Sequence, residues 1–106
     1  MIMIGVCDDD MAFANTLSKK IRENLWKLSE ELDCEIRTFF SADQVLGFVN
    51  HAVLQILFLD IDMPRRNGFE LAELLQNKSP DTIIVFVSAY ENLFDSTRLH
   101  SFAKVG

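Results

Sequence analysis

The chain has 106 residues, which suits one small domain with a single hydrophobic core and leaves no room for two. Ten basic and sixteen acidic residues give a formal net charge of -6, which argues against direct binding to nucleic acid. The apolar start is short and runs into three aspartates, so it fits neither a signal peptide nor a membrane span. Cys7 and Cys34 match no zinc or disulfide pattern, and we expect reduced thiols in a cytoplasmic protein.

The first half of the chain alternates apolar runs with helical patterns. A strand is predicted at about 1–7, and a second at about 34–40, nearer an edge of the sheet because its apolar residues alternate. Ser41 and Gln44 fit a capping box at the start of a helix that holds Val45 and Val49. Between the two strands, apolar residues recur at three- and four-residue intervals and predict an amphipathic helix: Ala14, Leu17, Ile21, Leu25 and Leu28.

The second half continues the alternation. A third strand is predicted at about 55–59, and Gly68 leads into a third helix in which Leu71, Leu74 and Leu75 share a face. A fourth strand is expected at 82–87 after a turn at 79–81, and a weaker helix at about 93–99. Right-handed crossovers make such a sheet parallel, so the predicted fold is α/β, a doubly wound sheet in the flavodoxin-like order 2-1-3-4-5.

Three of the predicted strands end in residues that carry chemistry. The first ends at Asp8-Asp9-Asp10, the third at Asp60 and the fourth at Ser88. In the expected strand order the first and third strands are neighbours at the switch point, where ligands bind beyond the carboxyl ends. We therefore expect Asp8, Asp9 and Asp60 to converge, with Ser88 beside them.

Carboxylates gathered in this way raise one another's pKa unless a cation lies between them. Magnesium, or manganese in its place, is a hard ion that takes oxygen ligands and is held by a few carboxylates plus a phosphate. An aspartate beside such a metal can act as a nucleophile toward phosphorus. Asp60 is the best candidate, because burying an unpaired carboxylate at the end of an apolar strand is costly without a partner.

Several of these residues also have structural explanations. Asp10 fits a solvated turn or a helix N-cap better than a ligand, and Ser88 in isolation fits a loop serine. Trp26 and the phenylalanines fall on core patterns, whereas His51 and His100 are isolated and fit surface or packing positions. The joint arrangement of the acidic residues with Ser88 is what favours a site.

Three parts of the chain form a set: the pair Asp8-Asp9, the segment Leu59-Asp60-Ile61-Asp62-Met63-Pro64 with Gly68, and the segment Val87-Ser88-Ala89-Tyr90. Taken together, they resemble the receiver domain of bacterial response regulators, the CheY-like superfamily, over essentially the whole of residues 1–106. The sequence around Cys7 and Asp60 is most similar to receivers attached to LytTR-type DNA-binding domains.

The resemblance implies a phosphoacceptor domain of a two-component system rather than a turnover enzyme. Asp60 would accept the phosphoryl group from a sensor histidine kinase, while Asp8, Asp9 and the backbone carbonyl of Asp62 would bind the metal. Ser88 would be the hydroxyl that moves toward the phosphoryl group. Transcription would be controlled through an output domain that is not in this chain, so any contact with DNA would be indirect.

Positions two residues beyond the acceptor and the switch hydroxyl tune phosphoryl lifetime in this family, which here implies Asp62 and Tyr90. The family's phosphate-contacting lysine would fall near position 108, and Lys104 is the nearest candidate, at a short spacing. Phe102 would stand in for the aromatic switch residue expected near Val105. The expected fold is truncated at or in strand five and lacks helix five, and an apolar sheet face left in this way would favour a homodimer.

Two other functions stay open from the residues alone. Asp60-x-Asp62 also resembles the first motif of haloacid-dehalogenase-type phosphatases, with Ser88 as their second motif. Those enzymes need a downstream lysine and acidic pair, and they leave Asp8-Asp9 unexplained. A pseudo-receiver that is never phosphorylated and serves as an interaction domain is the second alternative, which the unplaced lysine favours.

Overall fold

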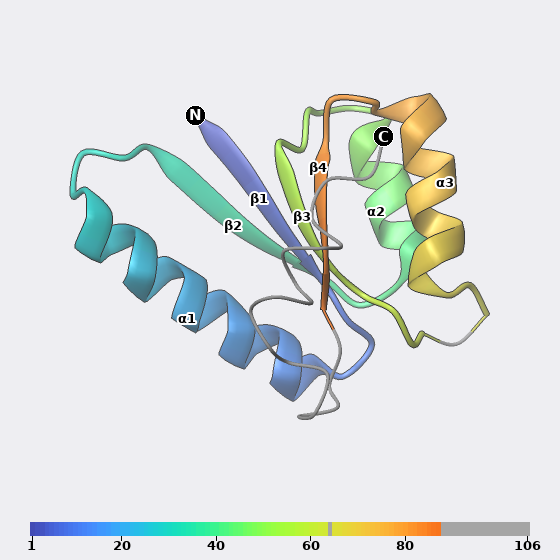
Figure 1. Cartoon of the computed structure of the whole chain (residues 1–106), viewed down its shortest axis with the longest axis horizontal. Helices are drawn as coiled ribbons and strands as arrows, with labels where there is room; N and C mark the ends of the chain where they lie inside the picture. The colour runs from blue at the N-terminus through green and yellow to red at the C-terminus, as the bar shows by residue number, and fades with distance from the viewer. Residues whose placement is uncertain (64, 88–106) are drawn as a thin grey trace.

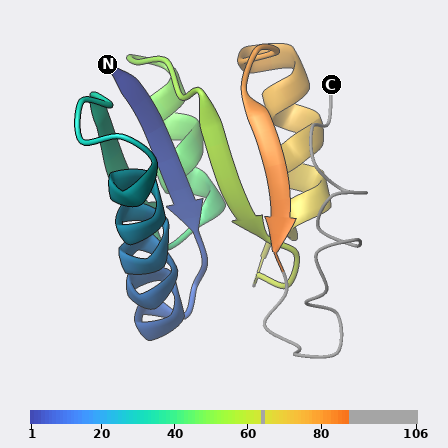
Figure 2. The same ribbon diagram turned by 60° about the vertical axis from the view of Figure 1, so that its left-hand side comes forward.

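The computed structural model describes residues 1–63 and 65–87, in which four parallel strands form one sheet in the order β2-β1-β3-β4. Helix α1 covers one face of the sheet, and α2 and α3 cover the other (Figures 1 and 2). This confirms the predicted doubly wound order for strands one to four; the expected fifth strand and the helix at 93–99 lie outside the described residues. The elements are β1 (Ile2–Cys7), α1 (Met11–Leu28), β2 (Cys34–Phe39), α2 (Ala42–Val49), β3 (Ile56–Asp60), α3 (Gly68–Lys78) and β4 (Ile83–Val87).

The register of the two central strands decides where the site forms. Cys7 at the end of β1 lies opposite Leu59 in β3, so the residues that follow them, Asp8 and Asp60, emerge at the same edge of the sheet. Asp60 in turn lies opposite Val87 at the end of β4. The apolar runs hold this register because slipping by one residue would turn buried side chains outward.

The hydrophobic core lies mainly between the sheet and the helices α2 and α3. Leu57 and Leu59 of β3 are fully buried, as are Leu71 and Leu75 of α3 and Val45 of α2. Burying a leucine side chain contributes on the order of 2 kcal/mol, so this layer anchors β3 and thereby the edge of the sheet where Asp60 lies.

Helix α1 is less completely buried than its apolar stripe predicts. Asp10 caps it, since its side chain accepts a hydrogen bond from Phe13 N at 3.1 Å, as the sequence led us to expect. Trp26 and Leu28 are 62% and 80% exposed, so the prediction that they belong to the core is wrong. The reason is that α1 packs chiefly on β1 and β2 at one side of the sheet, which leaves its last turns partly uncovered.

The N-termini of α2 and α3 are capped in different ways. Ser41 Oγ accepts from Gln44 N at 3.2 Å, but the Gln44 side chain accepts from Phe40 N at 2.7 Å, so the predicted capping box forms with a shifted partner. Helix α3 has the complete box, because Asn67 and Glu70 each accept from the other's backbone N–H.

Among the described residues, no helix combines the length and the apolar character that crossing a membrane requires.

Candidate functional site

Three carboxylates meet at the carboxyl edge of the sheet. Asp8 follows β1, Asp60 ends β3, and each of Asp8, Asp9 and Asp60 offers an oxygen within 4.8 Å of the others. Asp8 and Asp60 are 4% and 6% exposed, whereas Asp9 faces solvent. The arrangement brings together the acidic residues expected from the sequence, and their oxygens suit a hard divalent cation.

Backbone hydrogen bonds orient the two buried carboxylates. Asp10 N donates to Asp8 Oδ1 at 2.9 Å, and Asp62 N donates to Asp60 Oδ1 at 3.4 Å. Across residues 1–63 and 65–87, no lysine or arginine forms an ion pair with either group. The negative charge of the cluster is therefore offset by no basic side chain in the described part of the chain.

Burial and mutual repulsion shift the titration of this cluster. Burial, followed by the charge of Asp8, raises the pKa of Asp60 to about 7, although the hydrogen bond from Asp62 N opposes the shift. Burial also raises the pKa of Asp8, with the charges of Asp9 and Asp10 acting in the same direction. A site with these shifts is poised to take up either a proton or a metal cation.

This shift predicts that the metal-free protein loses stability as the pH rises. Folded Asp60 keeps its proton to about pH 7, whereas the unfolded chain releases it near the ordinary value of 3.8, so the stabilisation present below pH 4 is lost as the pH rises through 7. A rise in the pKa of Asp60 from 3.8 to about 7 corresponds to about 4 kcal/mol, which solvent screening reduces to roughly 1–2 kcal/mol.

Thermal denaturation in a chelator between pH 4 and pH 8 measures this loss. Added magnesium should raise the melting temperature more at pH 8 than at pH 5, because the cation competes with the proton for the same carboxylates. A melting temperature that rises with pH in the chelator and does not change when magnesium is added would contradict the raised pKa of Asp60.

Cys7 lies directly behind the acidic cluster. Its Sγ is 3.6 Å from Met63 Sδ and 3.7 Å from the Ser41 carbonyl oxygen. Burial, reinforced by the charges of Asp8 and Asp60, raises the pKa of the Cys7 thiol to about 12. The thiol therefore stays neutral and serves as a packing group against Met63, not as a nucleophile.

The loop from β3 to α3 folds tightly back onto the end of β3. Gly68 N donates to Ile61 O at 2.8 Å, and a Cβ at Gly68 would collide with the carbonyl oxygen of Asp60. Arg65 has a φ of 70°, the left-handed region that favours glycine. The sequence indicated a loop ending at Gly68, but no local signal pointed to the left-handed Arg65.

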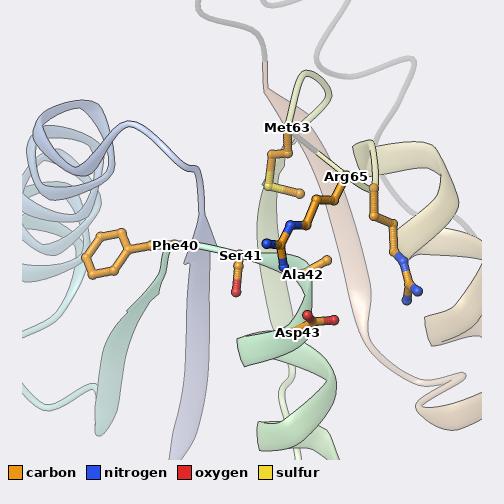
Figure 3. Close-up of a pocket in the computed structure, with 7 residues that line it drawn as sticks. Phe40, Ser41, Ala42, Asp43, Met63 and Arg65 are labelled. Atoms are coloured by element: carbon orange, nitrogen blue, oxygen red, sulfur yellow. The ribbon is translucent and has the colours of Figure 1, made fainter.

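This loop also borders a cavity. The cavity has a volume of about 310 Å³ and lies between the loop and the start of α2 (Figure 3). Met63 links it to the acidic cluster, because the same side chain touches Cys7. The lining residues are Phe40, Ser41, Ala42, Asp43, Met63, Arg65 and Arg66.

Of the other predicted site residues, the structure describes Asp62. Asp62 is exposed at the start of the loop, and the role of its carbonyl as a metal ligand stays a prediction. Ser88, Tyr90 and Lys104 lie outside the described residues, as do Phe102 and the elements expected around it. Sequence reasoning missed the contact of Met63 with Cys7, which joins residues 56 positions apart.

Comparison with curated proteins gives matches that include a response regulatory protein and a sensory transduction protein. The chain is 29% identical over 83 residues to protein PilG of Pseudomonas aeruginosa, covering 76% of this chain and 62% of PilG. It is 36% identical over 94 residues to an uncharacterized response regulatory protein of Shewanella oneidensis, covering 86% of this chain and 36% of that protein. The chain is also 39% identical over 54 residues to the sensory transduction protein LytT of Oceanobacillus iheyensis. This match covers 49% of this chain and 22% of LytT. The chain thus spans less than two thirds of each relative, and LytT fits the resemblance to LytTR-type regulators.

Solved structures and a family model agree with these matches. The response regulator TrrA of Thermotoga maritima, in complex with Mg(2+)-BeF, has a TM-score of 0.71 at 24% identity and covers 92% of this chain and 78% of TrrA. A receiver domain protein of Methanospirillum hungatei has a TM-score of 0.69 at 22% identity, covering 96% and 72%. Both likenesses support the fold. The family model of the response regulator receiver domain matches residues 4–103, and the chain therefore belongs to this family.

Proposed function

We propose that this chain is the phosphoacceptor receiver of a two-component response regulator, in which Asp60 accepts a phosphoryl group from a sensor histidine kinase. The observation that carries the proposal is the position of Asp60. It is a buried carboxylate at the end of a central strand, with oxygens of Asp8 and Asp9 within 4.8 Å. Receiver domains are phosphoacceptor signalling domains and not turnover enzymes.

Magnesium is the cofactor that best suits this donor set. Asp8, Asp9 and Asp60 supply carboxylate oxygens, and the carbonyl of Asp62 would complete the protein ligands. TrrA was solved with Mg(2+)-BeF, which makes the same kind of ion a reasonable expectation for this chain. Bound there, the ion would neutralise both the carboxylates and the oxygens of the incoming phosphoryl group.

The chain's own residues then have distinct tasks. The Asp60 carboxylate attacks phosphorus, and its hydrogen bond from Asp62 N holds the attacking group in place. The acyl phosphate adds a charge of about -1.5 to -2 beside Asp8, which is a large local change in a buried site. Ser88 and, with it, Lys104 are proposed to contact the phosphoryl group, while Tyr90 tunes its lifetime.

The regulatory consequences extend beyond this chain. The new charge is proposed to change the surface near β4, which would then alter a homodimer or an output domain. For a LytTR-type regulator the output would be transcription, with DNA contacted through the output domain. These steps rest on the family and on the match to LytT.

Incubation with magnesium and acetyl phosphate separates the three candidate functions. A stable acyl phosphate that is absent in Asp60→Asn supports the receiver. Sustained turnover of a phosphomonoester through Asp60 and Asp62 supports the phosphatase. A chain that neither gains a phosphoryl group nor binds beryllofluoride behaves as an interaction domain, and the proposal then fails.

Replacing Asp62 with asparagine is expected to lengthen the lifetime of the acyl phosphate. Asp62 is an exposed carboxylate two residues beyond Asp60, from where it can orient a water molecule that attacks phosphorus. We expect hydrolysis to slow about threefold to tenfold, less than the roughly 100-fold that a fully positioned base contributes. The measurement is the decay of phosphorylated protein after removal of the donor.

Asp81→Asn is the matched control for Asp62→Asn. Asp81 is also exposed and precedes β4, so the same charge is removed at the opposite edge of the sheet. Its hydrolysis rate should equal that of the wild type. Equal rates in all three proteins would show that Asp62 does not tune the lifetime.

A further inference from the structure

We propose that Arg65 and Arg66 form an anion-attracting surface that draws a small dianionic acyl phosphate toward Asp60. This inference rests on the proposed function, since it concerns how a phosphodonor reaches the same acceptor. The ligand class is a small acyl phosphate such as acetyl phosphate. The observation behind it is the placement of two arginines, which have no ion-pair partner among the described residues, in the loop that follows Asp60.

The edge that a phosphodonor must approach is strongly negative. Asp60 ends β3, and four further carboxylates lie in the turns that follow β1 and β3: Asp8, Asp9, Asp10 and Asp62. One divalent cation offsets only two of these five charges. A dianion approaching from solvent is therefore repelled unless positive charge lies nearby.

Arg65 and Arg66 supply that positive charge from the loop that follows the acceptor. Within the part of the chain that the structure describes, the ion pairs are those of the N-terminus with Asp33 and of Arg37 with Glu35. Neither loop arginine thus forms an ion pair with a carboxylate of residues 1–63 or 65–87. Arg65 is exposed and Arg66 half-buried, so both charges are accessible to a solute.

Both arginines line the cavity of about 310 Å³, and Met63 of the same lining contacts Cys7, the residue before Asp8. Figure 3 shows Arg65 extending across the cavity toward Ser41 and Asp43 at the start of α2. A cavity of this volume lies at the small end of the range for ligand sites, which suits a compact anion. Asp43 lowers the net positive charge of the cavity but leaves the two arginines in excess.

The length of the loop limits how far the arginines can lie from Asp60. Arg65 follows Asp60 by five residues, which span at most about 18 Å when extended. The loop is not extended, because Gly68 N bonds to Ile61 O and brings its two ends together. In 0.1 M salt an exposed charge acts over a Debye length of about 10 Å, so the arginines attract an anion that comes within that distance of the loop, and added salt removes the attraction.

The reaction served by this surface is balanced without a further reactant. An oxygen of the Asp60 carboxylate forms a bond to phosphorus, and the bond from phosphorus to the acyl oxygen breaks. Acetate leaves with the electron pair of that bond, and no net proton is exchanged. The total charge is -3 on each side: a carboxylate and a dianion give an aspartyl phosphate dianion and acetate.

The test compares Arg65→Gln/Arg66→Gln with Lys27→Gln/Lys78→Gln. The control removes the same charge from exposed lysines in the last turns of α1 and α3, at the opposite edge of the sheet. Initial phosphorylation rates are measured against acetyl phosphate concentration with magnesium, at low salt and at about 1 M salt, where the Debye length falls to about 3 Å.

We expect the arginine variant to lose about threefold to tenfold in the second-order rate at low salt, with an unchanged maximal rate and an unchanged melting temperature. The gap should close in high salt, and the lysine variant should match the wild type. Three results would overturn the inference without touching the proposed function. They are equal rates for the arginine variant and the wild type, a loss of rate that salt does not remove, and an equal loss of rate in the lysine variant. A wild type that gains no phosphoryl group at any concentration would overturn the proposed function as well.

Discussion

Asp60→Asn is expected to stabilise the metal-free protein while it removes the proposed phosphoacceptor. At pH 8 the wild type holds a buried carboxylate whose pKa burial has raised to about 7, next to the charge of Asp8. The amide keeps the shape and can still accept from Asp62 N, but it carries no charge. We expect a gain of roughly 1–2 kcal/mol in the free energy of unfolding in a chelator, after allowance for solvent screening.

The melting temperature in a chelator measures this gain, and about 1 kcal/mol corresponds to a shift of roughly 4 °C or more in a domain of this size. The pH dependence of stability should flatten in the variant, and magnesium should stabilise it less than the wild type. Asp81→Asn, which removes an exposed carboxylate, serves as the control and should change little. A variant less stable than the wild type at pH 8 without metal would contradict the account of the acidic cluster.

Gly68→Ala is expected to be the most destabilising single substitution near the site. A Cβ at this position would collide with the carbonyl oxygen of Asp60 and lie 3.0 Å from the Cα of Ile61. Both neighbours are backbone atoms of Asp60 and Ile61, so they cannot rotate away as a side chain would. We expect a loss of about 3 kcal/mol or more, a large share of the stability of a small domain.

Gly47→Ala is the matched control for this substitution. Gly47 lies within α2, and a Cβ there would meet no atom within 4 Å. The alanine should stabilise the protein by about 0.5–1 kcal/mol, because glycine is a poor helix former. Chemical denaturation of both variants gives the comparison, and a Gly68→Ala protein as stable as the wild type would refute the close approach of the loop to Asp60.

The strands and the acidic cluster could be predicted because the sequence marks them by pattern. Each central apolar run ends in an aspartate, and the parallel order β2-β1-β3-β4 places β1 beside β3. Once these strands are neighbours in register, Asp8 and Asp60 must emerge together. The helix cap at Asp10 was predictable for the same reason, since it depends on residues only three positions apart.

Features that depend on the folded surroundings could not be predicted. Trp26 falls on a helical pattern, yet its exposure depends on how far the sheet extends beneath α1. The contact of Met63 with Cys7 depends on the β1–β3 register and on the path of the loop. The left-handed Arg65 contradicts its own local preference, because the return of the chain to Gly68 imposes that conformation.

The position of the phosphoryl group is the most direct test of the central claim. Protein incubated with acetyl phosphate and magnesium is reduced with borohydride, which converts an aspartyl phosphate to a stable product, and the labelled peptide is sequenced by mass spectrometry. The account predicts a single label at Asp60 that requires magnesium. A label at Asp8, Asp9 or Asp62 in place of Asp60, or no label at all, would contradict it.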